Sequence, residues 1–205
     1  MESAPIDEAA ETPTERDFDY NRTVALSDGV FAIALTLLIL NVAHPGGGTF
    51  GDRVSDVAPA LGAYALSFAV IGMLWMRHHA LWRDMRRIDG RLVTLNLVYL
   101  GLIAFIPYPT GLLSDQGDVS FSVVVYAATL SLTALVAAGT RVYCSRRGLL
   151  KPESISAREA ASRPFIVAGV FAISIPIAFV SPSAAEWTWL LLFVLAVRRL
   201  RLTRS

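Results

Sequence analysis

Long apolar stretches separated by short polar connections dominate the sequence and predict membrane-spanning helices. A helix needs about 20 predominantly apolar residues to cross a bilayer, and five stretches reach that length. A sixth is shorter and spans only if Glu186 lies at one interface while Arg198 and Arg199 snorkel to the other. The predicted spans are residues 23–43, 57–76, 92–113, 119–140, 164–185 and 187–197. Asp28 is the only charged residue within them, and a carboxylate in hydrocarbon is a candidate functional group that needs a partner.

The distribution of basic residues supports six spans rather than five. Of the 18 Lys and Arg residues, 17 fall in the N-terminal segment, the second and fourth connections and the C-terminal segment. The first connection has only Arg53, and the third has none. The positive-inside rule therefore predicts that both termini are cytoplasmic. Trp187 and Trp189 stand at the start of the last stretch, where interfacial anchors are expected.

The composition agrees with a single membrane domain. Hydrophobic residues make up 54% of the chain and charged residues 17%, with a net charge of +1. Residues 1–19 are acidic and polar, so we expect a disordered N-terminal tail followed by one six-helix domain over residues 20–205. Cys144 is the only cysteine, and no Cys/His group has zinc spacing, so we predict no metal site and no cofactor.

The first predicted helix has two faces. At about 100 degrees per residue, Ile33, Thr36, Leu37 and Leu40 form one apolar stripe that a single hydroxyl interrupts. Asp28 lies roughly 140 degrees away from Ile33. The stripe alone is compatible with ordinary helix packing, and its geometry leaves that alternative open.

Depth in the membrane suggests the partners of Asp28. With a cytoplasmic N-terminus, Asp28 lies about one turn inside the membrane, level with His78 and Asn96. Trp75 is three residues before His78, and its indole N–H is a further donor. We expect these side chains to form a buried network that joins three helices. His79 is expected to be an ordinary interfacial residue.

Several motifs in the first three predicted spans resemble those of a known family. The resemblance rests on Arg22, the segment from Leu26 to Leu40, Ser67-Phe68, Trp75-x2-His78-His79, Asn96-Leu97 and Pro107-x-Pro109-Thr110. Together they resemble the prokaryotic branch of the transmembrane protein 175 family of potassium channels. The likeness covers the first three spans well and the last three by hydropathy alone. Leu26 is a departure, because the family commonly has Phe before Ser-Asp.

The resemblance implies an all-α homotetramer of six-helix subunits, in which four copies of the first helix line a central pore. Ile33 would form the narrowest apolar ring, with Leu37 and Leu40 forming further rings and Thr36 adding a hydroxyl ring. The polar network would contain Arg22, Ser27, Asp28, Trp75, His78 and Asn96. The chain would then conduct potassium passively, with modest selectivity over sodium, across the cell membrane. The sequence also lacks the Thr-Val-Gly-Tyr-Gly filter of ordinary potassium channels.

Two other classes of protein fit less well. A secondary cation or proton transporter of six spans typically has inverted repeats with matching helix breaks, whereas Pro107, Pro109 and Pro176 show no such symmetry. An intramembrane enzyme needs a nucleophile or a set of metal ligands, and Asp28 with two histidines is too few. The sequence therefore favours a channel, and the lipid bilayer, monovalent cations and copies of itself are its expected partners.

Overall fold

The regular structure of the described residues is helical. A computed structural model describes residues 15–42, 44, 46–116, 119–152 and 157–189. The elements are α1 (Glu15–Leu37), the 3-10 helix η1 (Leu38–Asn41), α2 (Phe50–Arg83), α3 (Gly90–Phe105), α4 (Pro107–Gln116), α5 (Ser120–Arg146) and α6 (Ala157–Val180). Residues 182–189 are also helical. The predicted all-α class is therefore confirmed.

The described segments that can cross a membrane match the first four predicted spans. They are Tyr20–Asn41, Phe50–Arg83, Gly90–Asp115 and Ser120–Arg146, judged by length and hydropathy. The fifth predicted span corresponds to α6, within which Val167–Val180 is a shorter apolar segment. Most of the sixth, residues 187–197, lies outside the described residues.

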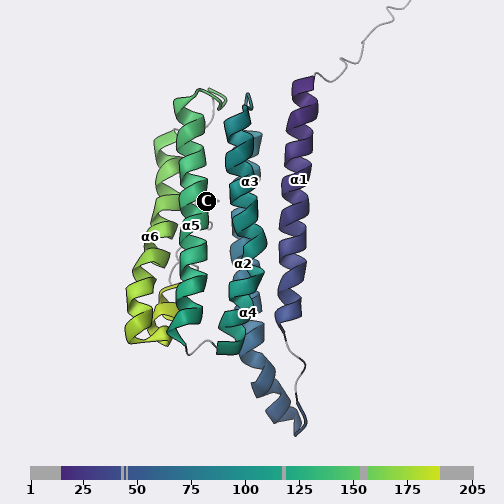
Figure 1. Ribbon diagram of the computed structural model, residues 1–205, viewed down its shortest axis with the longest axis vertical. Coiled ribbons are helices and arrows are strands. Elements are labelled where there is room, and N and C mark those ends of the chain that lie inside the picture. The colour runs from purple at the N-terminus through teal and green to yellow at the C-terminus, as the bar shows by residue number, and fades with distance from the viewer. Residues whose placement is uncertain (1–14, 43, 45, 117–118, 153–156, 190–205) are drawn as a thin grey trace, which may run out of the picture.

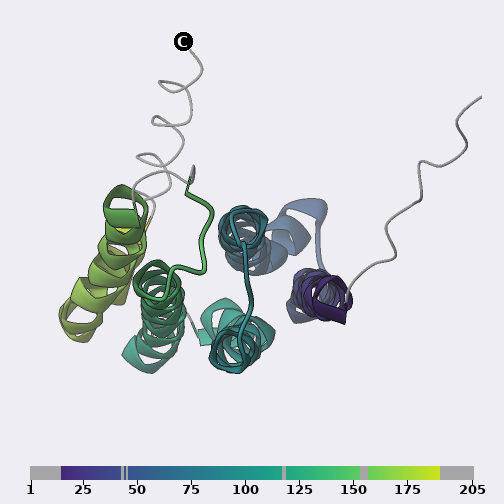
Figure 2. The ribbon, with the colours of Figure 1, turned by 90° about the horizontal axis from the view of Figure 1, so that it is seen from above.

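The helices form a row with α1 at one end and α6 at the other (Figures 1 and 2). α2 and α3 lie between α1 and α5, and the N-terminal part of α2 projects beyond the bundle (Figure 1). The core contains side chains from nearly every helix, among them Phe31, Ile71, Tyr99, Ile103, Tyr126 and Leu130. Since α1 stands at the end of the row, the described part of its own subunit covers only one of its faces.

α1 and α2 both begin earlier than the apolar pattern predicted. α1 begins at Glu15, so residues 15–19 are helical and not part of a disordered tail. Acidic residue types are favoured in a first helical turn, where they complement the helix dipole. α2 begins well before residue 57 because Thr49 and Asp52 form a capping box: the Thr49 N–H donates to Asp52 Oδ2 at 2.9 Å, and the Asp52 N–H donates to Thr49 Oγ1 at 3.3 Å.

The first and third predicted spans are not continuous α-helices. The first changes from α1 to η1 after Leu37. The third divides into α3 and α4 at Ile106, because Pro107 has no N–H to continue the ladder and is favoured as the first residue of a new helix.

Trp189 is a core residue, which corrects the prediction that it anchors the chain at the interface. Its side chain is 2% exposed and its ring centroid lies 5.0 Å from that of Tyr126. Its indole N–H donates to Ser174 Oγ at 2.9 Å, which satisfies the polar end of the buried ring. Trp187 is 68% exposed, so the two tryptophans face opposite environments.

Hydrogen bonds join the connection between α2 and α3 to the connection that follows α5. The Arg86 N–H donates to the Leu149 carbonyl at 2.8 Å, and the Lys151 N–H donates to the Asp84 carbonyl at 2.9 Å. These bonds hold the α2–α3 connection against the chain that follows α5. The start of α3 and the end of α5 are thereby fixed beside one another.

The opposite end of α1 is fixed to the start of α4. Asn41 Nδ2 donates to the Pro107 carbonyl at 2.8 Å. Gly111 passes so close that a Cβ added there would lie 2.8 Å from Asn41 Oδ1. The absence of a side chain at Gly111 therefore allows η1 and α4 to approach.

We expect Gly111→Ala to destabilise the protein, because the new methyl group must displace the Asn41 amide from Pro107. The cost should be about 1 kcal/mol, the value of one typical hydrogen bond. Gly101→Ala is the matched control, since nothing lies within 4 Å of a Cβ at that position in α3, and helix propensity alone should make it neutral or stabilising. Thermal unfolding in detergent measures both, and equal melting temperatures for the two variants would contradict the close approach.

Candidate functional site

The predicted apolar stripe of α1 is exposed in the subunit. Ile33 is 60% exposed and Leu40 75%, and the side chains of Thr36 and Leu37 are exposed between them. The helix packs on its own subunit through a different stripe, Phe31, Ala34 and Leu38, which is almost completely buried. Packing within the described part of the subunit therefore does not account for the exposed stripe.

The helix change near the end of the stripe preserves its alignment. Leu40 lies in η1, three residues after Leu37. Residues three apart eclipse one another in a 3-10 helix, so Leu40 stays above Leu37 although the α-helix has ended. The Thr36 hydroxyl donates to the Ile33 carbonyl at 2.9 Å. Its proton is thus used within the helix, and the oxygen retains a lone pair for another donor or a cation.

A buried polar chain joins α1, α2 and α3. Ser27 Oγ donates to the Thr23 carbonyl at 2.8 Å, and Asn96 Nδ2 donates to Ser27 Oγ at 3.1 Å. Asn96 Oδ1 lies 2.8 Å from His78 Nε2, and the Trp82 indole N–H lies 2.8 Å from that same nitrogen. The Ser27, Asn96 and His78 side chains are all buried. Such a chain ties three helices together at one level.

The His78 ring is the branch point of this chain. Asn96 Oδ1 can only accept, and the Trp82 N–H can only donate. The bond to Asn96 Oδ1 requires His78 with its proton on Nε2, whereas the bond from Trp82 requires Nε2 without a proton. Rotation of the Asn96 amide by 180 degrees would instead present its NH2 group to Nε2. The ring is held in place by Tyr99, which stacks on it with centroids 5.4 Å apart.

Asp28 does not lie beside His78 and Asn96, as predicted, whereas its predicted bond to Trp75 is present. Its side chain is exposed at the edge of α1, where Oδ1 accepts the Trp75 indole N–H at 2.9 Å. Ser27, one residue earlier and about 100 degrees round the helix, takes the place beside Asn96 that was predicted for Asp28. His79, expected to be an ordinary interfacial residue, stacks on Trp75 with centroids 5.5 Å apart. The residues predicted to form one network therefore fall into two groups. Ser27, Asn96 and His78 belong to the buried chain, and Asp28 and Trp75 form an exposed pair.

Arg22 lies earlier in α1 with an exposed side chain. Its place in the polar network remains a prediction.

A second buried polar cluster was not predicted. The Ser67 hydroxyl lies 3.0 Å from the Tyr126 hydroxyl and 2.8 Å from the Thr110 hydroxyl. Thr110 Oγ1 also lies 2.9 Å from the Ile106 carbonyl, at the bend between α3 and α4. Ser67 and Thr110 were visible in the sequence as parts of short motifs, but nothing in the sequence indicated that Tyr126 of α5 would join them.

Residues 22–107 match the family described as endosomal/lysosomal potassium channel TMEM175. A potassium channel of Streptomyces collinus is 42% identical over 97 residues, which cover 46% of this chain and 47% of the relative. A potassium channel of Chamaesiphon minutus is 36% identical over 125 residues, which cover 56% of this chain and 61% of the relative. The chain thus spans about half to three fifths of the length of these curated relatives.

A solved structure extends the likeness beyond the matched segment. The crystal structure of a lysosomal potassium-selective channel TMEM175 homolog from Chamaesiphon minutus has a TM-score of 0.76 and 25% sequence identity. The similarity covers 89% of this chain and 98% of that one. The exposed stripe of α1 lies within residues 22–107, and so do the hydrogen-bonded side chains of Ser27, Asn96, His78 and Trp82.

We expect Asn96→Leu to be strongly destabilising, because it leaves His78 and Ser27 buried without their shared partner. Each stranded group should cost about 1–3 kcal/mol. Thr94→Val is the matched control: it removes an exposed hydroxyl of the same helix that bonds only to the Gly90 carbonyl. If thermal unfolding in detergent shows similar losses for both variants, the buried chain does not hold the helices together.

Proposed function

We propose that this chain belongs to the TMEM175 family, whose model matches residues 22–107, and that it is a potassium-permeable cation channel that conducts passively across the membrane. The observation that carries this proposal is the stripe of Ile33, Thr36, Leu37 and Leu40, which α1 leaves exposed at the end of the helix row. A stripe that the described part of its own subunit does not cover is available to line a pore between subunits.

The proposed assembly is a homotetramer in which four copies of α1 surround the ion path. The position of α1 at one end of the row supports this arrangement, because neighbouring subunits can approach it without displacing another helix (Figure 2). Each subunit would have six spans, with residues 187–197 as the last, within one domain over residues 20–205. Both termini would be cytoplasmic and the protein would lie in the plasma membrane.

The proposed constriction is apolar and gates by dewetting. Four copies of Ile33 would form its narrowest ring, with Leu37 and Leu40 continuing the apolar wall towards the outside. Water leaves a sufficiently narrow apolar passage, and an ion cannot cross without water or protein oxygens to replace it. Widening the rings admits water and permits the passage of partly hydrated ions.

Selectivity in this proposal depends on neutral oxygens. Thr36 is the only residue of the stripe with a side-chain oxygen, and its proton is directed to the Ile33 carbonyl. A ring of such oxygens attracts cations without the strong field of carboxylates. Potassium would therefore be the permeant ion, with a modest preference over sodium, and no cofactor would be required.

The buried chain and the exposed pair would hold α1 in register. Ser27 is tied to Asn96, and Asp28 is tied to Trp75, so successive residues of α1 are bound to α3 and α2 respectively. We place Arg22 in the same network as the nearest basic residue of α1 to Asp28. These contacts would fix the direction in which Ile33 and Thr36 point.

Flux through liposomes tests the proposal against a secondary transporter. Purified protein should release potassium down its gradient at a rate that follows an imposed voltage, without a counter-transported proton or sodium ion. A flux that instead requires a second ion gradient, and stops when that gradient is removed, would identify a coupled transporter.

We expect Ile33→Asn to raise basal potassium flux, because a polar side chain hydrates the narrowest ring. Leu132→Asn is the control, since it makes a comparable polar change at a half-exposed position of α5, away from α1. The increase should be several-fold for Ile33→Asn and absent for Leu132→Asn in the same flux assay. An assembled Ile33→Asn protein with unchanged flux would show that this face of α1 does not line the pore.

Thr36→Val should lower the preference for potassium over sodium while conduction continues, because valine keeps the shape and removes the oxygen. Reversal potentials under bi-ionic conditions measure the effect. The control is Thr94→Val, which removes an exposed threonine hydroxyl on α3. An unchanged reversal potential in Thr36→Val would remove this hydroxyl from the account of selectivity.

A further inference from the structure

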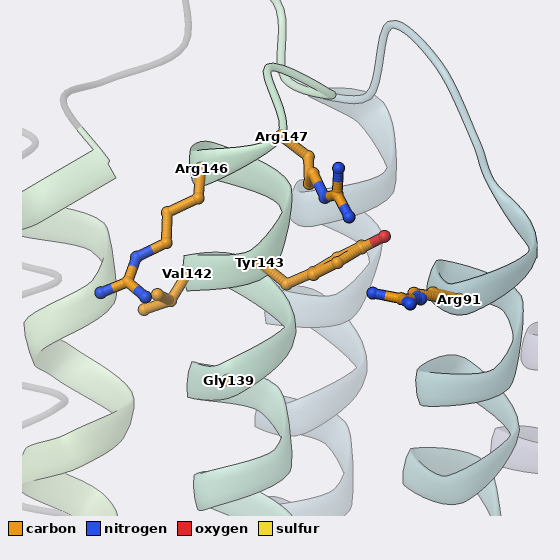
Figure 3. Close-up of a pocket in the computed structure, with 6 residues that line it drawn as sticks. All are labelled: Arg91, Gly139, Val142, Tyr143, Arg146 and Arg147. Atoms are coloured by element: carbon orange, nitrogen blue, oxygen red, sulfur yellow. The ribbon is translucent and has the colours of Figure 1, made fainter.

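A basic cavity lies where the first turn of α3 meets the end of α5. Its volume is about 570 Å³. It is lined by Arg91, Gly139, Val142, Tyr143, Arg146 and Arg147. Figure 3 shows it on the side of the bundle, close to the connections that follow α2 and α5. None of these residues belongs to the exposed stripe of α1 or to the polar clusters described above.

Two guanidinium groups converge on the Tyr143 hydroxyl. Arg91 reaches it from α3 and Arg147 from the end of α5, while Arg146 extends to the other side of Tyr143, towards α6 (Figure 3). The Cζ atom of Arg147 lies 5.9 Å from the centroid of the Tyr143 ring. The cavity therefore brings together cationic groups from the ends of two helices.

The carboxylate nearest to this cavity is already occupied by hydrogen bonds. Asp89 Oδ2 accepts the Tyr143 hydroxyl at 2.6 Å, and Oδ1 accepts the Leu92 N–H at the start of α3 at 2.8 Å. The bond from Tyr143, then that from Leu92, and the charges of Arg147 and Arg91 lower the pKa of Asp89, so it is ionised at neutral pH.

The three arginines retain an excess of positive charge. Among the side chains that the structure describes, Asp89 supplies one carboxylate against three guanidinium groups, and its oxygens are directed to Tyr143 and Leu92. Within the described ranges, none of the three arginines forms an ion pair; the nearby bridge joins Arg141 to Asp84 at 3.9 Å. Their positive field is therefore available to an anion from outside the chain.

An apolar surface leads away from the cavity along α5. Leu135, Gly139, Val142 and Arg146 recur at helical spacing on one side of the helix. Leu135 is 45% exposed, and nothing lies within 4 Å of a Cβ placed at Gly139. The positive end of this surface lies where lipid headgroups are expected, and its apolar part continues towards the bilayer centre.

We propose that this cavity binds the phosphate of an anionic phospholipid from the cytoplasmic leaflet. Arginine matches phosphate geometry with two parallel hydrogen bonds, and basic pockets on the cytoplasmic side of membrane helices suit anionic headgroups. The acyl chains would lie along Leu135 and Val142, with room at Gly139. The placement in the cytoplasmic leaflet follows from the distribution of basic residues, and the binding of lipid does not depend on the conduction of ions.

Native mass spectrometry of the full-length, delipidated protein tests this site. Phosphatidylglycerol and phosphatidylcholine with identical acyl chains are the two probes, and the ratio of their apparent affinities is the readout. The triple variant Arg91→Gln, Arg146→Gln, Arg147→Gln should lower the preference for phosphatidylglycerol about a hundredfold, because each basic residue near a membrane surface contributes about fivefold. The lysine triple at the same positions should keep only part of it, because lysine restores the charge but not the two parallel hydrogen bonds of arginine.

The matched control removes the same charge from the neighbouring connection. Arg83, Arg86 and Arg87 have exposed side chains and do not line the cavity, so their triple replacement by glutamine should leave the preference nearly unchanged. If the two triple variants lose the preference for phosphatidylglycerol equally, the lipid is attracted by the overall positive charge of this surface. That result would overturn the proposed site. Displacement of the lipid by millimolar inorganic phosphate would overturn its assignment to a lipid in favour of a free anion. If the first triple loses its thermal transition, the single variants Arg91→Gln and Arg147→Gln provide the same comparison.

Discussion

The absence of water from the bilayer interior governs this fold. A hydrogen-bonding group that faces hydrocarbon must find its partner within the protein. Some polar side chains of the spans bond to a carbonyl of their own helix, and others meet that requirement by pairing with another helix. The bond from Asn96 to Ser27 joins α3 to α1, and the contact between Ser67 and Tyr126 joins α2 to α5. Polar residues at single positions thus specify which helices are neighbours, where apolar surfaces alone would permit several arrangements.

The same requirement separates the two sides of α1. The buried side combines Ser27 with Phe31, Ala34 and Leu38, and it is committed to α2 and α3. The opposite side has Ile33, Thr36 and Leu40 and has no cover from the described part of its own chain. A helix with one face packed on its own subunit and another face left exposed suits the ion path that we propose between subunits.

Sequence reasoning predicted the helices and the alignment of Ile33, Thr36, Leu37 and Leu40 along one side of α1, because both depend on the spacing of residues along the sequence. Spacing alone left open whether that stripe packs inside the subunit. It was less successful where the answer depends on rotation and tertiary contact. Depth alone could not distinguish Asp28 from Ser27 as the neighbour of Asn96, since adjacent residues differ little in height but by about 100 degrees in direction. Trp189 was placed at the interface because tryptophan is common there, whereas its burial depends on Ser174 and Tyr126, which no local pattern connects to it.

The attachment of α1 at both ends has a mechanical consequence. Asn96 holds the helix near its first third, and Asn41 holds η1 to the first residue of α4, just beyond the bend at Ile106. Because α1 and η1 are attached at two points to the segment formed by α3 and α4, α1 cannot tilt independently of that segment. Since Trp75 also ties α1 to α2, any widening of the proposed ion path beside Ile33 must carry α2, α3 and α4 with it. The moving part is then the block from α1 to α4, and its resistance to displacement depends on the bend between α3 and α4.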